Sequence, residues 1–362
     1  MRLIALVVAA TALLVAGCGA AATEPPTSSA SPGAQGEWRQ VALGEKAPPG
    51  LDGEATVETW YSVTTPDPAH AWMVGMDGVI YATADGGSTW QAQTAAGNIG
   101  AGATNAGQVF AVDAGHVWGV SAGGRIVATA DGGATWTEQQ SPAQHLAGVS
   151  FCDPMNGWAV GGGDIVHTSD GGTTWEAQSA PLGALKDDRD GLTAVSCVDP
   201  EHAWAARLRL KVQGNTVTSV STVYGTSDGG ATWRKLWSGD AGARHIEFVD
   251  AQHGWMAGGG VWATSDGGLT WHRQPGAGSW ISDISFVDAQ RGWVSDFDAR
   301  HWPAILQTVD GGQTWTRQTL RSLGLAKNRM ADAWGIAFSD ARHGWAVGNT
   351  GDWQLVGRYA PR

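Results

Sequence analysis

Six aspartates recur in nearly identical surroundings, and they are the first residues of this sequence that could do chemistry. Each lies in an eight-residue turn such as TSDGGTTW (168–175), whose relatives are TADGGSTW, TADGGATW, TSDGGATW, TSDGGLTW and TVDGGQTW. Carboxylates can bind calcium or transfer protons, but this spacing lacks the alternating acids of a calcium loop, and six equivalent sites would be needed. We therefore predict structural roles for Asp85, Asp131, Asp170, Asp228, Asp266 and Asp310 and for Trp90, Trp136, Trp175, Trp233, Trp271 and Trp315.

The residue types of this DGG turn explain such a role. An Asp side chain can accept hydrogen bonds from backbone N–H groups of its own turn. The Gly pair permits positive φ angles that other residues avoid. A Trp that follows the turn can wedge between neighbouring structural units, where its large apolar surface contributes to the core.

A second motif alternates with the DGG turn and places an Asp five residues before a Trp. The pairs are Asp67/Trp72, Asp113/Trp118, Asp153/Trp158, Asp199/Trp204, Asp250/Trp255, Asp288/Trp293 and Asp340/Trp345. Successive Trp residues are 38 to 52 positions apart, which is the size of a four-stranded propeller blade. Histidines recur at one position of this motif, so the pattern favours a structural role over metal ligation for His70, His116, His202, His253 and His343.

The count of motifs predicts how the ring closes. Seven Asp–Trp motifs but six DGG turns occur, and the seventh unit ends at Arg362 without a fourth strand. The segment EWRQVAL (37–43) resembles the strand that follows a DGG turn, as in TWTRQTL. We therefore predict an all-β, seven-bladed β-propeller (37–362) with four-stranded antiparallel blades, in which the N-terminal strand completes the last blade and covers its edge.

The motifs also carry a family resemblance. The DGG turn resembles the Asp-box of BNR repeats, which sialidases, xyloglucanases and sortilin-type receptors share. Combined with units such as SFCDPMNGWAVG, it most resembles the photosystem II stability/assembly factor-like family across residues 37–362. That resemblance implies a seven-bladed propeller and an assembly-factor role, although one fold can carry many functions.

Residues outside the repeat give little support for catalysis. A sialidase-like or glucanase-like hydrolase needs two carboxylates in a cleft, and the acids that depart from the repeat are Glu247, Asp296 and Asp298. We expect Glu247 to pair with Arg244 or His245. We predict a non-catalytic protein without a cofactor or a metal site, and keep a divergent glycoside hydrolase or a glycan-binding module as the alternative.

The departures from the repeat predict a binding surface instead. Between Ala206 and Tyr224 lies a long hairpin, on which period-two alternation places Arg207, Arg209 and Lys211 on one side. Other long loops of the same face supply Trp302, Lys327, Arg329 and Trp353. Long loops on a rigid scaffold commonly carry function, so we predict that this face binds an acidic protein partner, while a solvated hairpin is the alternative.

Composition and the N-terminus indicate where the protein works. The formal net charge of −12 disfavours nucleic acid as a partner. Residues 1–18 read as an export signal whose end, VAGC, resembles the bacterial lipobox with Cys18 as the lipidated residue, and 19–36 form a Pro-rich flexible linker. We thus expect a monomer that is held at the bacterial envelope, outside the cytoplasm, through its lipid anchor alone.

Two further cysteines remain in the propeller, Cys152 and Cys197, at the first strands of consecutive units. Neither belongs to a CxxC motif, so a zinc site has no support. An oxidising compartment would allow a disulfide between them, but their opposite parity along the strands lets the side chains point toward each other or apart. The sequence leaves both arrangements open.

Overall fold

The computed structural model describes most of the chain from Gly36 onward as one compact unit, Gly36–Arg362. The described residues are 36–41, 60–75, 78–93, 107–186, 190–213, 216–297, 303–318, 332–349 and 354–361. Among them there is no helix, and therefore none that is long and apolar enough to cross a membrane. The predicted signal segment 1–18 and residues 19–35 of the predicted linker lie outside these residues, whereas Gly36, which was assigned to the linker, begins the first described strand.

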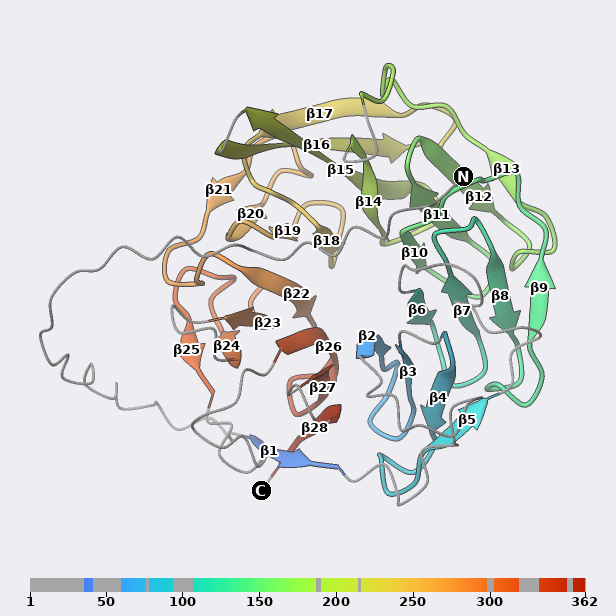
Figure 1. Cartoon of the computed structure of the whole chain (residues 1–362), viewed down its shortest axis with the longest axis vertical. Helices are drawn as coiled ribbons and strands as arrows, with labels where there is room; N and C mark the ends of the chain where they lie inside the picture. Colours follow the sequence, from blue (N-terminus) through green and yellow to red (C-terminus); the bar gives the residue numbers. More distant parts are fainter. Residues whose placement is uncertain are drawn as a thin grey trace, which may run out of the picture. The chain divides into compact units, whose positions relative to one another are not determined.

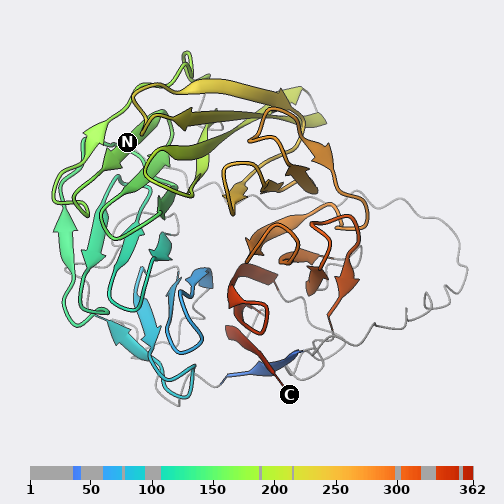
Figure 2. The same cartoon turned by 180° about the vertical axis from the view of Figure 1, so that it is seen from behind.

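Seven four-stranded antiparallel sheets surround a central channel, so the predicted seven-bladed propeller is confirmed. In Figures 1 and 2 the first strand of each blade borders the channel and the fourth strand lies at the rim. The strands are β-branched and aromatic, and Gly, Asp and Pro residues fill the connections, as local preferences require.

Within each blade the first strand lies at the channel and the fourth strand lies at the rim (Figure 1). Blades 1 to 3 consist of β2 (Trp60–Thr64), β3 (Ala71–Gly75), β4 (Ile80–Thr83), β5 (Gln91–Gln93); β6 (Gln108–Ala111), β7 (Val117–Val120), β8 (Ile126–Thr129), β9 (Thr137–Gln139); β10 (Gly148–Phe151), β11 (Gly157–Gly161), β12 (Asp164–Thr168), β13 (Glu176–Ala177). Blades 4 and 5 consist of β14 (Asp190–Cys197), β15 (His202–Gln213), β16 (Thr216–Ser227), β17 (Arg234–Gly239); β18 (His245–Phe248), β19 (Gly254–Ala257), β20 (Val261–Thr264), β21 (His272–Arg273). Blades 6 and 7 consist of β22 (Ile281–Phe286), β23 (Gly292–Phe297), β24 (Pro303–Thr308), β25 (Thr316–Arg317); β26 (Asp332–Asp340), β27 (His343–Asn349), β28 (Gln354–Pro361), β1 (Gly36–Gln40).

The N-terminal strand closes the ring, as the motif count predicted. Strand β1 pairs antiparallel with β28, in a register that runs from Gly36 opposite Pro361 to Gln40 opposite Gly357. The side chain of Trp38 is buried against Tyr359, with ring centroids 5.3 Å apart. The last blade thus joins the two ends of the propeller, and β1 covers the edge that β28 would otherwise expose.

The DGG turns have the predicted hydrogen-bonding role. In the turn of blade 3, Asp170 Oδ1 accepts the backbone N–H of Thr174 at 2.9 Å, while Oδ2 accepts its hydroxyl at 2.7 Å. Gly171 and Gly172 have φ angles of 72° and 89°, a conformation that favours glycine. The same bond to the Asp carboxylate recurs in all six turns.

Tryptophans join neighbouring blades, also as predicted. Trp175, which follows the DGG turn of blade 3, packs in one buried cluster with Trp118 of blade 2, and its indole N–H donates to Gln139 of blade 2 at 3.0 Å. Trp118 stacks on Phe151 of blade 3 with centroids 3.5 Å apart. Equivalent stacks join Trp204 to Phe248, Trp255 to Phe286 and Trp293 to Phe338.

The recurring histidines stabilise turns. In blade 1, the Nδ1 atom of His70 lies 2.9 Å from Asp67 Oδ2, and the same carboxylate accepts the backbone N–H groups of Ala69 and His70. The equivalent contact forms at His116, His202, His253 and His343. Each Asp–Trp motif therefore starts with an Asp that holds its own turn.

Candidate functional site

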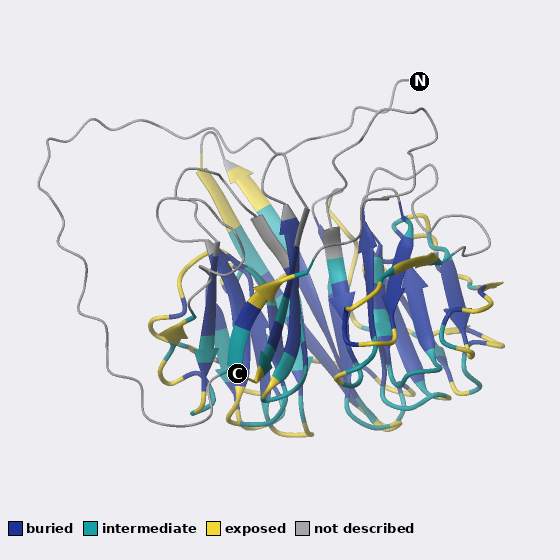
Figure 3. Cartoon of the chain, turned by 90° about the horizontal axis from the view of Figure 1, so that it is seen from below, coloured by how far each residue is buried: buried dark blue, intermediate teal, exposed yellow. Residues whose placement is uncertain are grey.

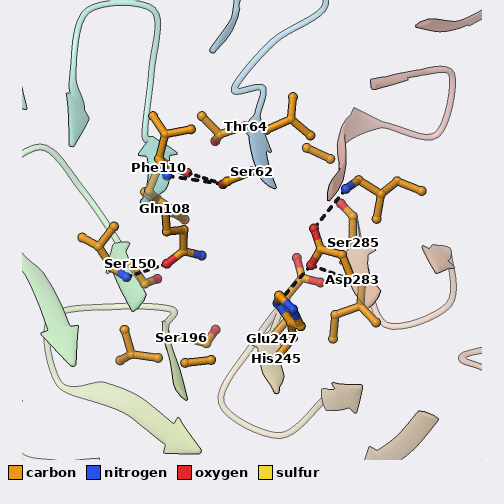
Figure 4. A pocket seen from close by; sticks show the side chains of 18 of the residues that line it. Ser62, Thr64, Gln108, Phe110, Ser150, Ser196, His245, Glu247, Asp283 and Ser285 are labelled. Carbon is orange, nitrogen blue, oxygen red and sulfur yellow. Dashed lines mark hydrogen bonds and ion pairs between the residues drawn. The ribbon is translucent and has the colours of Figure 1, made fainter. Parts of the chain in front are cut away.

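The central channel carries ionisable side chains on the first strands of two blades, whereas the described first strands of the other blades contribute none to its lining. A cavity of about 430 Å³ is bordered by the first strands of the blades. Figure 4 shows that His245, Glu247 and Asp283 group on one wall, whereas Gln108, Phe110 and Ser150 lie across from them. His245, Glu247 and Asp283 are the titratable residues among the described residues that line the cavity.

One position of each first strand faces this channel, namely the third residue before the Asp of the Asp–Trp motif. We call it the inward position, and blades 1 to 7 place there Thr64, Phe110, Ser150, Ser196, Glu247, Ser285 and Ala337. Where it is a hydroxyl, the side chain accepts a backbone N–H from the next blade: Ser196 from Phe248 at 2.9 Å, and Ser285 from Phe338 at 3.0 Å. Thr64 and Ser150 make the same bond to Ala111 and Cys197.

Glu247 occupies the inward position of blade 5 and makes the equivalent bond with one carboxylate oxygen. Its Oε2 atom accepts the backbone N–H of Phe286 at 2.9 Å. Burial, above all, raises the pKa of Glu247 well above its ordinary value, and the negative charge of Asp283 raises it further, against the effect of the Phe286 bond. A carboxyl group therefore stands where neighbouring blades use a hydroxyl, at a greater cost of desolvation.

Asp283 lies on β22 of the next blade and has its oxygens occupied. Oδ1 accepts the backbone N–H of Ile284 at 2.9 Å and lies 3.1 Å from His245 Nδ1, while Oδ2 accepts the N–H of Ile336 at 3.0 Å. Burial raises the pKa of Asp283, and His245 and the two backbone bonds counter only part of that effect. Asp283 therefore links blade 6 to blades 5 and 7.

The structure corrects the expected pairing of Glu247. Glu247 contacts Phe286 rather than Arg244 or His245, because the imidazole of His245 is held by Asp283 and the side chain of Arg244 is exposed. Sequence reasoning did not single out Asp283. An alignment of the seven first strands would have revealed it, because it lies five residues before the motif Asp, where blades 1, 2 and 5 carry Ser62, Gln108 and His245.

Asp296, the other described acid that the sequence analysis considered, does not extend this group. Asp296 is buried in β23 and packs against the backbone of Gly278, away from the channel lining. Asp298 lies outside the described residues. Asp296 is thus separated from Glu247, and Glu247 with Asp283 form the carboxyl pair among the described residues of the channel lining.

The predicted hairpin forms, but its first basic residue has a different role from the one expected. Arg207 is buried, and its Nε and Nη2 atoms donate to Asp190 at 2.6 and 2.8 Å. Burial tends to raise the pKa of Asp190, but the bonds from Arg207 and from the Lys186 backbone N–H lower it overall. Arg207 therefore anchors the base of the hairpin and is not part of an exposed basic row, because Asp190 of β14 lies beside it.

The outer part of the hairpin is exposed. Pairing with β14 ends at Arg209 and pairing with β17 ends at Ser221, so among the described strands the hairpin continues as a two-stranded ribbon. Its exposed end appears in yellow above the blades in Figure 3. Lys211 is exposed. Arg209 lies 4.0 Å from Asp190 Oδ2 through its Nε atom and remains 37% exposed. The facing side chains of Val212 and Val217 are 49% and 61% exposed.

The remaining predicted contact residues, Trp302, Lys327, Arg329 and Trp353, lie outside the described residues, as does Cys18. Their roles stay predictions.

Cys152 and Cys197 meet at the junction of blades 3 and 4. Both are free thiols, and Cys152 packs against the buried cluster that contains Cys197 and Trp158. Cys197 takes the place that Phe occupies in blades 3, 5, 6 and 7. Burial, followed by a hydrogen bond with Cys152, raises the pKa of the Cys197 thiol. The side chains therefore point toward a shared cluster, while the disulfide itself stays a prediction.

Comparison with known proteins places the fold but not the function. No family model and no curated protein matches the sequence. A structure of YCF48 bound to D1 peptide is similar with a TM-score of 0.62 and 18% identity, over 93% of this chain and 99% of that one. YCF48 from Cyanidioschyzon merolae gives 0.60 and 22%, over 89% and 98%. The GH74 xyloglucanase from Xanthomonas campestris gives 0.58 and 16%, over 88% of this chain and 54% of that enzyme. At such identities the likeness shows a shared propeller architecture.

Proposed function

We propose that this protein is a non-catalytic propeller that binds a protein partner through the exposed end of the β15–β16 hairpin. The projecting ribbon carries this proposal, because it combines basic side chains, an exposed valine pair and backbone edges that no described strand covers. An extended peptide can add a strand to such an edge. The similar fold of YCF48, whose structure contains a bound D1 peptide, supports a peptide-binding role.

Charge suggests the chemistry of the partner. Arg209 and Lys211 are cationic on a protein with a net charge of −12, so they would attract an acidic segment while the rest of the surface repels it. By the alternation of side chains along a strand, Val212 and Val217 lie on the opposite face of the ribbon, where they would contact an apolar residue on that face of a strand added at its edge.

Capture from membranes of the native organism tests the proposal. The wild-type protein should retain a partner that Arg209→Gln/Lys211→Glu loses, whereas Arg342→Gln/Lys235→Glu, which changes the charge by the same amount elsewhere, should retain it. Glutamine at position 209 avoids a carboxylate beside the buried Asp190. Arg207 must be left intact, because its substitution would disturb the fold. Equal capture by both double variants would contradict the role of the hairpin.

We also propose that Cys18 anchors the protein to the envelope, on the basis of the lipobox-like VAGC. Cys18→Ala should then move the protein from the membrane fraction to the soluble fraction. A variant that still sediments with membranes would refute the anchor.

A divergent glycoside hydrolase is the second candidate, because Glu247 and Asp283 supply a carboxyl pair in the channel. Hydrolysis needs both carboxyl groups at the sugar. Both Asp283 oxygens already accept hydrogen bonds within the protein, so binding is favoured over catalysis. Reducing-sugar release from xyloglucan that disappears in Glu247→Gln would instead establish the enzyme.

A further inference from the structure

We propose that the central channel binds a cationic group, a primary ammonium or a guanidinium, at the free oxygen of Glu247 beside the Asp283–His245 pair. This site is separate from the hairpin of the proposed function. It is formed by β18 and β22, where two carboxyl groups from neighbouring blades enter one cavity of about 430 Å³. The volume accommodates an alkylammonium or the end of a Lys or Arg side chain.

The repeat supplies the first reason. At the inward position, Ser150, Ser196 and Ser285 each accept one backbone N–H from the next blade, which is all that the junction requires. Glu247 makes that bond with Oε2 alone. Because a hydroxyl suffices in the neighbouring blades, the second oxygen of Glu247 exceeds the structural need.

The surroundings of that oxygen supply the second reason. Among the described residues, Phe286 is the donor to Glu247, and its bond goes to Oε2, so Oε1 has no donor there. The described lining contains neither Lys nor Arg, and the one nearby basic group, His245, is held by Asp283. Glu247 is partly buried and lines the cavity, so an entering cation would supply the charge and the donors that the described lining does not give to Oε1.

The same contacts disfavour other ligands. An anion would face the Glu247–Asp283 pair without a Lys or Arg among the described lining residues. A neutral ligand could accept a hydrogen bond from protonated Glu247, but it would gain nothing from the second carboxylate. A cation interacts favourably with both groups, and the proximity of Asp283 strengthens its attraction.

Binding should therefore be coupled to proton release. Glu247 is the group that loses its proton when the cation binds, since its raised pKa keeps it protonated over a wider pH range before binding. A cation stabilises the ionised form, so affinity should rise with pH as Glu247 loses its proton. His245 and Asp283 are the other titratable groups of the described lining, and protonation of His245 would oppose the cation.

Calorimetry with the full-length protein tests this site. Spermidine represents a free amine, and acetyl-Ala-Lys-Ala-amide represents a lysine within a peptide, with acetyl-Ala-norleucine-Ala-amide as the neutral counterpart. At least one cationic probe should bind, with proton release that appears as a dependence of the heat on the buffer. Spermidine alone would indicate a free amine as the ligand, and the peptide alone would indicate a polypeptide.

Glu247→Ser is the decisive variant, because serine makes the equivalent junction bond in blades 4 and 6 and should preserve the fold. It should weaken cation binding about tenfold or more, as the loss of a charge-assisted bond requires. Glu138→Gln removes the same charge from the exposed pair with Arg125 and should leave binding unchanged. The proposal would be overturned if Glu247→Ser bound the cation as tightly as the wild type, or if the norleucine peptide bound as tightly as the lysine peptide. Failure of both cationic probes to bind the wild type would also overturn it. A thermal melt verifies that Glu247→Ser is folded. If this variant does not fold, Glu247→Gln takes its place in the binding experiment.

Discussion

The DGG turns and the wall of the channel at blades 5 and 6 use the same residue types in opposite ways. In the turns, hydrogen bonds from Thr89 to Asp85 and from Thr135 to Asp131 lower the pKa of both carboxyls to about 2. In the channel, burial raises the pKa of Glu247 and Asp283. The acids of the turns stabilise the fold in their ionised form, whereas ionisation of the channel acids destabilises it. Repeated positions therefore maintain the scaffold, and departures from the repeat are the better indicators of function.

Removal of β1 should have the largest effect, because it breaks the scaffold that both regions share. Deletion through Val41 exposes the edge of β28 and removes the buried Trp38, so we expect loss of cooperative unfolding or of solubility. Deletion through Gln35 should melt like the full chain. Circular dichroism melts compare the two, and identical transitions would disprove closure by β1.

The substitution Arg207→Ala should come next. It leaves the carboxylate of Asp190 buried without its main partner, which typically costs about 3–5 kcal/mol of unfolding free energy. Lys211→Ala, on the same side of the hairpin but exposed, should change the free energy little. Urea unfolding measures both, and similar effects of the two variants would show that Arg207 does not anchor the hairpin.

Acid should weaken the DGG turns. The pKa values of Asp85 and Asp131 are about 2 in the folded protein, below the ordinary 3.8. Their contribution is therefore complete above pH 4 and is lost as the pH falls toward 2. Melting temperatures recorded between pH 5 and pH 2 should decline more steeply for the wild type than for Asp131→Asn, which should already melt lower at pH 7. Parallel curves would argue against this role.

The smallest effect should have the opposite sign. Because the pKa of Glu247 is raised, its contribution to stability is favourable below its ordinary value of 4.5 and is lost as the pH rises. Glu247→Gln should therefore melt slightly higher than the wild type at pH 8 and equally at pH 4, while Glu138→Gln should show no such gain. A lower melting temperature of Glu247→Gln at pH 8 would mean that the carboxylate is stabilised in the empty channel.

Local chemistry explains why the fold could be predicted so fully. The hydrogen bonds of each DGG turn join residues within four positions of one another, so a short motif specifies them. The seven repeat units must bury their Trp residues against each other. The missing fourth strand of the last unit has one counterpart in the sequence, the segment that contains Trp38. Period-two alternation likewise placed Arg207, Arg209 and Lys211 on one side of the hairpin.

Contacts between distant strands, within a blade or across two blades, were decided by the tertiary structure alone. Asp190 and Arg207 are 17 positions apart, and Glu247 meets the N–H of a residue 39 positions away. No local pattern encodes which side chain of the adjoining blade or strand will face a charge, so the same sequence letters allowed an exposed Arg207 and a Glu247 paired with His245. Pairing of β14 with β15 within blade 4 brought Asp190 to Arg207, and the packing of β18 against β22 across two blades brought Glu247 to Phe286. The sequence by itself determined the propeller, and packing of strands within and between blades determined where its charges became buried.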